Sequence, residues 1–340
     1  MRHNQGEFRM AEWLERFKDD PLIYPQKLVP AEDRVLLVEL TEEILQGHSF
    51  LDDRIFHTAM PFEWLPWRDF EQLASALSPR APSYIFHIGH CGSTLLSRLV
   101  AEATGSLALR EPLPLRVLAI NRAESVVDWL DDKETHKRLR LFERTWSRGD
   151  RPTTVKATSM CTNLVSEVNK DSRVVFMYQP AETHLAVLLA GENSMQDLAG
   201  FGRNRHTRLG AITEGLPPLQ SMSGGELAAL TWLAEVSSAA PALRERAAFS
   251  LDFDTFLTDP EELLRQTCGA LGLETTAEQC TKAVAGPIMR SYSKAPEHNY
   301  GPKLREDIIA DSKRRNTEEI KKGMRFVERF RPTTCGADWR

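Results

Sequence analysis

The chain has 340 residues, 41% of them hydrophobic, which is enough to build a sizeable core in one large α/β domain or two smaller ones. Its net charge of −5 argues against a general attraction to nucleic acid or to a membrane surface. The five cysteines are scattered and lack metal-ligand spacing, as expected of reduced thiols in a cytoplasm. The sequence has no apolar signal segment and no stretch that could span a membrane, so we expect a soluble, cytoplasmic protein.

Residues 1–80 are predicted to form a helical extension that packs on a main domain formed by residues 81–340. Residues 11–17 are amphipathic, and residues 31–45 have the apolar content of a longer helix. Residues 62–67 are dense in aromatic side chains, which usually pack an extension onto a core but could instead wall a substrate pocket.

Residues 84–99 are predicted to form a strand, a tight loop and a helix. Such a junction directs backbone N–H groups and a helix dipole at one spot, which is typical of a phosphate site. If Gly92 takes the place of the glycine before a Walker lysine, the lysine slot holds Ser93 and the hydroxyl slot Thr94. His87 then fills the first-glycine slot, so the loop argues against ordinary NTP hydrolysis. A junction that binds nothing is the alternative.

Strands and helices alternate after this loop. We predict strands over 83–88, 107–110, 153–155, 173–178 and 248–251, and helices over 94–103, 124–148, 181–190 and 226–246. The alternation implies right-handed crossovers and a parallel sheet covered on both faces, an α/β fold. Ligands of such sheets lie at the carboxyl ends of the strands, so the candidate site residues beside the loop are Glu111, Lys156 and Tyr178.

Residues 191–224 are polar, with Arg203, Arg205, His206 and Arg208 close together. We expect a mobile surface segment whose arginines form a solvated face, and a lid over an anionic cofactor is the alternative.

These landmarks together resemble the PAPS-dependent sulfotransferase superfamily (donor: 3'-phosphoadenosine 5'-phosphosulfate) over residues 83–300. Residues 89–96 are similar to the family's phosphosulfate loop, x-x-[K/R]-[S/G]-G-[S/T]-T-x-L. Residues 173–180 resemble the strand that ends in Arg-Asp-Pro, and residues 252–273 resemble the late signature Y-E-D-L-x-x-D-P-E … L-x-L-G-L. The resemblance is nearest to the bacterial and protein-tyrosine branches. It implies a P-loop-like three-layer sandwich with a central parallel sheet, a helical N-terminal extension and inserts.

The resemblance also implies roles. Glu111 would be the catalytic base, Lys156 would stabilise the leaving phosphate, and His90 stands at the family's basic loop position. The 5'-phosphosulfate would be held by the loop, which comprises Gly89, His90, Cys91, Gly92, Ser93, Thr94 and Leu95. No metal would be required. Alternatively, Glu111 is a loop carboxylate, Lys156 a solvated strand end and His90 a turn cap.

Two positions depart from the family pattern. His90 replaces a fixed positive charge with one that depends on pH. Tyr178 takes the slot of the arginine that holds the 3'-phosphate, and Ala186 falls where a serine is expected. Because a phosphate is usually bound by bidentate arginine, other cations would have to compensate. The candidates are Arg203, Arg205, Arg290, Lys294 and Lys303, and Ser293 joins them because residues 290–294 loosely resemble a donor-contacting segment.

The sequence therefore predicts an enzyme that transfers a sulfuryl group from PAPS to a hydroxyl or amine of an unidentified acceptor. Two other classes stay open. An ATP-dependent, kinase-like transferase would have to work without a Walker lysine and without a clear aspartate for Mg²⁺. A non-catalytic binding protein on a degenerate sulfotransferase fold would explain Tyr178 and His90, but not the retention of Glu111 and Lys156. The acceptor and the oligomeric state stay undetermined.

Overall fold

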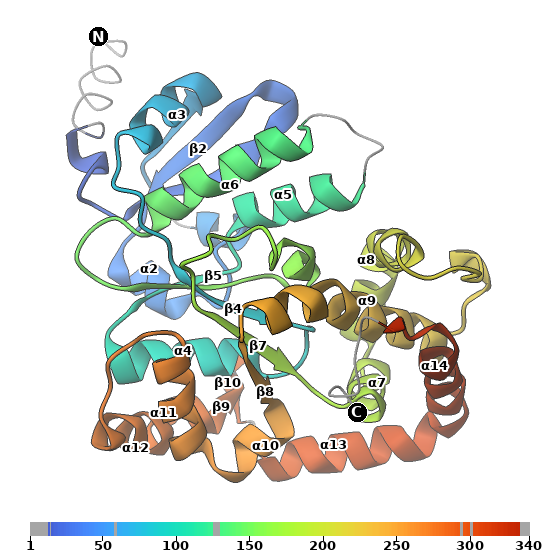
Figure 1. Cartoon of the computed structure of the whole chain (residues 1–340). Helices are drawn as coiled ribbons and strands as arrows, with labels where there is room; N and C mark the ends of the chain where they lie inside the picture. The colour runs from blue at the N-terminus through green and yellow to red at the C-terminus, as the bar shows by residue number, and fades with distance from the viewer. Residues whose placement is uncertain are drawn as a thin grey trace.

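The computed structural model describes residues 13, 15–57, 60–124, 130–292, 295–299 and 302–333 (Figure 1). The strands are β1 (Ile23–Val29), β2 (Arg34–Glu39), β3 (Phe62–Pro66), β4 (Ser83–His87), β5 (Leu107–Arg110), β6 (Thr153–Lys156), β7 (Val174–Tyr178), β8 (Phe249–Asp252), β9 (Ser291–Tyr292) and β10 (Ala295–Asn299). The α-helices are α2 (Glu42–Gly47), α3 (Trp67–Ser75), α4 (Ser93–Thr104), α5 (Leu113–Ala123), α6 (Asp132–Trp146), α7 (Ala181–Leu189), α8 (Glu192–Gly210), α9 (Gly224–Glu245), α10 (Phe253–Thr258), α11 (Pro260–Ala270), α12 (Ala277–Ala285), α13 (Pro302–Arg315) and α14 (Thr317–Phe330). The short 3₁₀ helices include η2 (Asp53–His57) and η3 (Ser159–Leu164). No helix within the described ranges is long and apolar enough to cross a membrane.

Five parallel strands form the central sheet in the order β5-β6-β4-β7-β8. β4 lies in the middle, paired with β6 on one side and with β7 on the other. The chain first builds one half of the sheet with β5 and β6 and then crosses to the other half for β7 and β8. This reversal puts a topological switch point, the usual ligand position, at the carboxyl end of β4. The predicted α/β fold is confirmed, and each of the five predicted strands is present.

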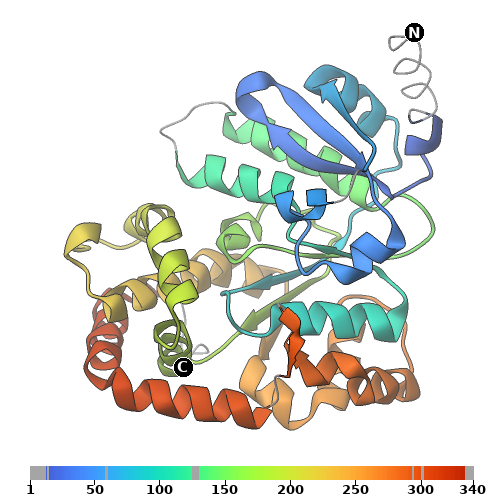
Figure 2. The ribbon, with the colours of Figure 1, turned by 180° about the vertical axis from the view of Figure 1, so that it is seen from behind.

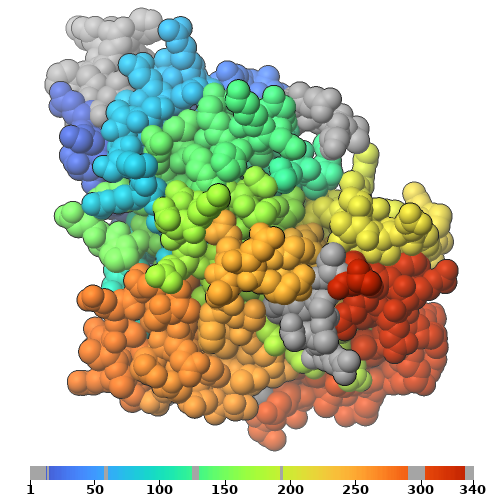
Figure 3. Space-filling view, in the orientation of Figure 1, coloured from blue at the N-terminus to red at the C-terminus, as the bar shows by residue number. Residues whose placement is uncertain are grey.

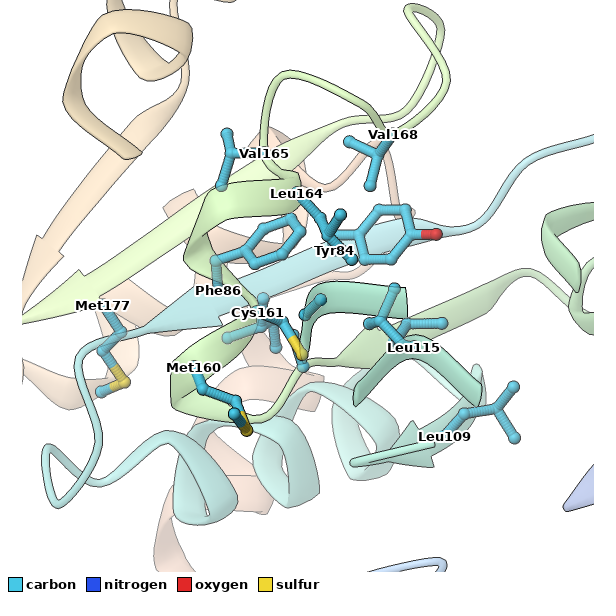
Figure 4. Close-up of a cluster of buried hydrophobic side chains, with 14 of the residues drawn as sticks. Tyr84, Phe86, Leu109, Leu115, Met160, Cys161, Leu164, Val165, Val168 and Met177 are labelled. Carbon is cyan, nitrogen blue, oxygen red and sulfur yellow. The ribbon is translucent and has the colours of Figure 1, made fainter. Parts of the chain in front are cut away.

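Helices cover both faces of the sheet and make it the middle of three layers. α4 lies on one face with α11 and α12, and η3 lies on the other with α5 and α6, as the two opposite views show (Figures 1 and 2). Because side chains alternate along a strand, Tyr84 and Phe86 of β4 share a face, and their rings stack with centroids 5.3 Å apart. They point toward Leu164 and its neighbours after β6, which close the core on that side (Figure 4).

The predicted helix over residues 31–45 is wrong. Its middle is β2, the central strand of an antiparallel sheet β1-β2-β3, with a short 3₁₀ helix (Pro30–Glu32) before it and α2 after it. Residues 35–38 are four consecutive apolar residues, all buried. A short run of this kind fits a strand buried on both faces as well as a helix, so the spacing could not decide between them.

The N-terminal sheet and α3 pack on α6 through aromatic rings. The ring of Trp67 lies 5.4 Å from that of Phe70 and 6.0 Å from that of Phe142 in α6. Phe142 in turn stacks on Trp146 at 5.7 Å. Figure 3 shows this blue part of the chain against the green surface of α5 and α6. Of the aromatic residues predicted over 62–67, Trp67 thus packs against α6, whereas Phe62 is exposed.

Two further segments differ from the prediction. Residues 191–224, predicted as a mobile surface segment, contain the 19-residue helix α8. In the predicted helix over 124–148, residues 125–129 lie outside the described residues and α6 spans 132–146. α5 was not predicted, although Pro114 in its first turn is a typical helix-start signal.

Helices α9 and α14 cross at glycines, which generates a stability prediction. A β-carbon on Gly323 would lie 2.3 Å from Leu185 Cδ2 and 2.5 Å from the carbonyl oxygen of Gly225. We expect Gly323→Ala to lower the free energy of unfolding by about 1–3 kcal/mol, the usual cost of overpacking. Gly269→Ala in α11 is the control, because no atom lies within 4 Å of its added carbon. Urea unfolding measures both, and equal stabilities of the two variants would contradict the close crossing.

Candidate functional site

The loop between β4 and α4 lines a cavity of about 340 Å³. Gly92, the N-cap of α4, has a φ of 72°, and a β-carbon there would lie 2.2 Å from the ring of Phe253. Glycine is therefore required at this position. No side chain caps α4, so the N–H groups of its first turn are available to a ligand. The cavity-lining residues of the predicted loop are Gly89, His90, Gly92, Ser93, Thr94 and Leu95. Cys91 does not line the cavity; it is buried and donates its thiol to the carbonyl of Met177.

His87 fixes the base of the loop. Its Nδ1 accepts a hydrogen bond of 2.9 Å from the amide of Gly89, which leaves the proton on Nε2. Nε2 donates to the carbonyl oxygen of Ala157 at 2.8 Å. The imidazole thus ties the end of β4 to the segment after β6. His87, which takes the first-glycine slot of a Walker loop, is therefore a buried structural residue that links two segments at the edge of the cavity.

Lys156 and Glu111 form an ion pair in the cavity. β5 and β6 pair with Arg110 opposite Lys156, and the amide of Glu111 donates to the carbonyl of Lys156 at 2.7 Å. The carboxylate therefore leaves the sheet beside the ammonium, and Lys156 Nζ bonds Glu111 Oε1. The side chain of Lys156 is 1% exposed and that of Glu111 is 17% exposed. The φ of Glu111 is 57°, a strained value for a non-glycine residue of the kind found at functional sites.

Three arginines that the sequence did not single out line the same cavity: Arg54, Arg116 and Arg305. Arg54 donates hydrogen bonds to Asp52. Partial burial acts to raise the pKa of Asp52, but these hydrogen bonds outweigh burial and hold the pKa below its usual value. The buried Arg305 lies 2.7 Å from Asp254 Oδ1, with its guanidinium 5.0 Å from the centroid of Phe253. Arg116 and Arg305 lie in α-helices, α5 and α13. A basic residue in an amphipathic helix carries no local signal that separates a cavity wall from solvent.

Among the described residues, none of the cations predicted to compensate for Tyr178 lines the cavity. Arg203 and Lys303 are exposed and, like Tyr178, do not line the cavity. Arg205 is buried behind it, and Ala186 is buried in α7. Ser293 and Lys294 lie outside the described residues, as does the side chain of Arg290.

The predicted solvated face of arginines is wrong for Arg205 and Arg208, which are buried, whereas Arg203 is exposed. Both bond the fully buried carboxylate of Glu235 in α9, Arg205 through Nε at 3.1 Å and Arg208 through Nη2 at 2.9 Å. Thr162 donates to the same carboxylate at 2.6 Å. The signal in the sequence was Glu235 itself, a single acid within an apolar run, which needs a buried cation.

This buried network reaches the cavity through Asp197. The carboxylate of Asp197 accepts from Arg205 at 3.1 Å and lies 4.0 Å from His90 Nε2. α8 is thereby held as one wall of the cavity, with the loop imidazole facing its acid.

Comparison with known proteins gives a fold likeness. A scan against models of protein families found no match, and a search of curated proteins found none either. Similar solved structures include three sulfotransferases. The sulfotransferase domain from the curacin biosynthetic pathway is 13% identical, with 73% of this chain and 98% of that chain covered and a TM-score of 0.43. Sulfotransferase STF9 from Mycobacterium avium is 12% identical, with 71% and 78% covered and a TM-score of 0.41. A sulfotransferase from Alicyclobacillus acidocaldarius is 13% identical, with 73% and 96% covered and a TM-score of 0.34.

His184, in α7, gives a prediction about pH. It is fully buried, and neither ring nitrogen has a hydrogen-bond partner among the described residues. Burial, helped by the nearby charges of His90 and Arg205, lowers the pKa of His184 well below the usual histidine value. The unfolded chain takes up this proton near pH 6.5 and the folded chain does not, so stability falls as the pH drops below about 6.5.

In His184→Leu this contribution is absent. Between pH 6.5 and the pKa of the folded state, we expect its unfolding free energy to fall less steeply than that of the wild type, by up to about 1.4 kcal/mol per pH unit. Urea unfolding at a series of pH values measures the slopes. Parallel curves for the two proteins would contradict a buried, neutral His184.

Proposed function

We propose that the protein is a sulfotransferase-like enzyme that moves a sulfuryl group from PAPS to a hydroxyl or amine of an acceptor. The observation that carries the proposal is the Lys156–Glu111 pair, which lies in the same cavity as the phosphate loop. Sulfuryl transfer needs a cation that neutralises the leaving phosphate and a base that takes the proton of the acceptor. The two side chains supply both beside a phosphate cradle.

The loop fits the 5'-phosphosulfate of the donor. The amides that open α4 lack a side-chain cap, and the buried Oγ1 of Thr94 has no hydrogen-bond partner among the described residues. Buried polar groups are normally satisfied, and an anionic oxygen would satisfy these donors. Lys156 would hold the same phosphate from the other side of the cavity.

We assign the 3'-phosphate to Arg305 in place of the expected strand-end arginine. Arg305 lines the cavity beside Phe253 and Met289, whereas Tyr178 does not line it. A guanidinium has five N–H donors, so contact with Asp254 leaves others for a phosphate. The apolar neighbours of Arg305 would take the flat adenine.

The chemistry follows from these positions. The acceptor oxygen attacks sulfur in line while the bond from sulfur to the phosphate oxygen breaks, and its electron pair stays on the phosphate. Glu111 takes the proton of the attacking hydroxyl, and Lys156 neutralises the charge that develops on the leaving phosphate. Until substrates bind, the ion pair keeps both groups in the cavity.

Glu111→Gln tests the base, because it keeps the size of the side chain and removes the charge. We expect sulfate transfer from labelled PAPS to a panel of phenols, sugars and alcohols to fall about 10²–10⁴-fold, the usual contribution of a general base. Lys156→Met should also lower turnover, and the double variant, which buries no unpaired charge, keeps the fold testable. Glu102→Gln, exposed on α4 outside the cavity, is the control. Full activity in either single variant would remove the role that we assign to it.

Arg305→Gln tests the donor. By calorimetry, we expect the wild type to bind adenosine 3',5'-bisphosphate more tightly than adenosine 5'-monophosphate by about tenfold or more, the worth of one charge-assisted hydrogen bond. Arg305→Gln should remove this preference, and Lys303→Gln, exposed on the same helix, should keep it. Tight binding of ATP–Mg²⁺ instead of the bisphosphate would replace the proposal with a kinase-like transferase. Binding of neither nucleotide would favour a non-catalytic protein.

A further inference from the structure

A second cavity, of about 410 Å³, joins the first through shared walls. Asp52, Arg54 and Arg116 line both cavities. The second one lies between β1 and α5, which pack together, and Figure 2 shows the blue N-terminal segment beside α5. None of its lining residues belongs to the phosphate loop, as far as the described residues go. A molecule in this second cavity would therefore reach the site from the side of Glu111 and not from the side of the loop.

The wall that α5 contributes is apolar. Leu113, Val117 and Ile120 are spaced four and three residues apart and so form one strip along the helix. Each is partly exposed, and Leu28 of β1 belongs to the same lining. This strip would hold the apolar part of an elongated molecule.

The charges of the second cavity do not cancel. Its two acids are each paired: Lys27 Nζ lies 3.0 Å from Asp53 Oδ2, and Arg54 Nε donates to Asp52 Oδ1 at 2.7 Å. Arg116 is the remaining cation. Its charge helps to lower the pKa of Asp52, but no ion pair or hydrogen bond joins it to a residue that the structure describes. Its guanidinium carbon lies 5.1 Å from the centroid of Phe201 in α8, a cation–π contact that holds it between the two cavities.

We propose that this groove admits the acceptor, and that the acceptor is an amphipathic hydroxyl compound with an oxyanion, such as a carboxylate, bound by Arg116. This inference rests on the proposed function and names the acceptor class of that site. The apolar strip holds the body of the molecule, and Arg116 binds its anionic group. The hydroxyl then lies beside Glu111, which lines the first cavity together with Arg116.

The test uses two pairs of probes that differ only in charge: 3-(4-hydroxyphenyl)propanoate with its amide, and 8-hydroxyoctanoate with its amide. Binding to the full chain is measured by calorimetry with and without saturating adenosine 3',5'-bisphosphate. We expect the acid of at least one pair to bind about tenfold more tightly than its amide, the worth of one charge-assisted hydrogen bond. Arg116→Gln should remove this preference, and Arg116→Lys, which keeps the charge but not the fork of donors, should keep part of it.

Two more variants locate the effect. Val117→Trp fills the apolar strip and should weaken acid and amide alike. Arg122→Gln is the matched control on the same helix, because Arg122 pairs with Asp132 and Glu167 and does not line the groove. It should keep the preference for the acid.

The inference is overturned if acid and amide bind equally or not at all in both pairs, or if the preference survives Arg116→Gln. It is also overturned if Arg116→Gln weakens binding of the bisphosphate as strongly as Lys156→Met does, since Arg116 would then belong to the donor site. Failure of the proposed function looks different: the bisphosphate does not bind the wild type, whereas the acid and amide can still be compared without nucleotide.

Discussion

The pairing of one ammonium with one carboxylate at the ends of adjacent strands determines how the rest of the cavity is built. A buried ammonium without a partner is destabilised by several kcal/mol, so Lys156 and Glu111 must stay together. The register of β5 and β6 ensures this. Arg110, the residue before Glu111, donates to the carbonyls of Gln46 in α2 and of His48 just after it, and its own carbonyl accepts from the amide of Leu51. These bonds hold Phe50 with its ring centroid 5.3 Å from the ammonium.

A second set of buried charges has the opposite character. Glu235 is completely enclosed and receives hydrogen bonds from two arginines and a threonine, so its charge is fully compensated inside the protein. The carboxylate of Glu111 has one buried partner and an open side toward the cavity. The first arrangement rigidifies the wall that α8 forms, and the second leaves a carboxylate that can exchange partners. Enclosure on all sides thus distinguishes Glu235 from Glu111, which keeps one side open to the cavity.

The sequence was sufficient for the parts of the site that follow from strand order. Once residues 84–99 were identified as strand, loop and helix, parallel topology brought Glu111 and Lys156 to the same edge as the loop. The sequence was not sufficient to predict the burial of a charged residue whose ion-pair partner lies far away in the chain. Arg205 pairs with the buried Glu235 of another helix, but its neighbourhood in sequence is polar, so it resembled a surface residue. The positions of Arg116 and Arg305 in the cavity wall depend on how their helices are rotated about their axes, which is set by tertiary packing and not by the residues themselves.

The close approach of Gly92 to the ring of Phe253 has a consequence for folding during synthesis. The loop follows β4, an early strand of the sheet, but the ring on which it rests comes after β8, the last strand to join. Because chains emerge from the ribosome with the N-terminal end first, the loop is made long before its support. α4 is likewise synthesised before α11 and α12, the helices that pack against it. A partly synthesised chain therefore lacks the support of this loop, and the cavity beside it is complete only when nearly all of the core has been synthesised.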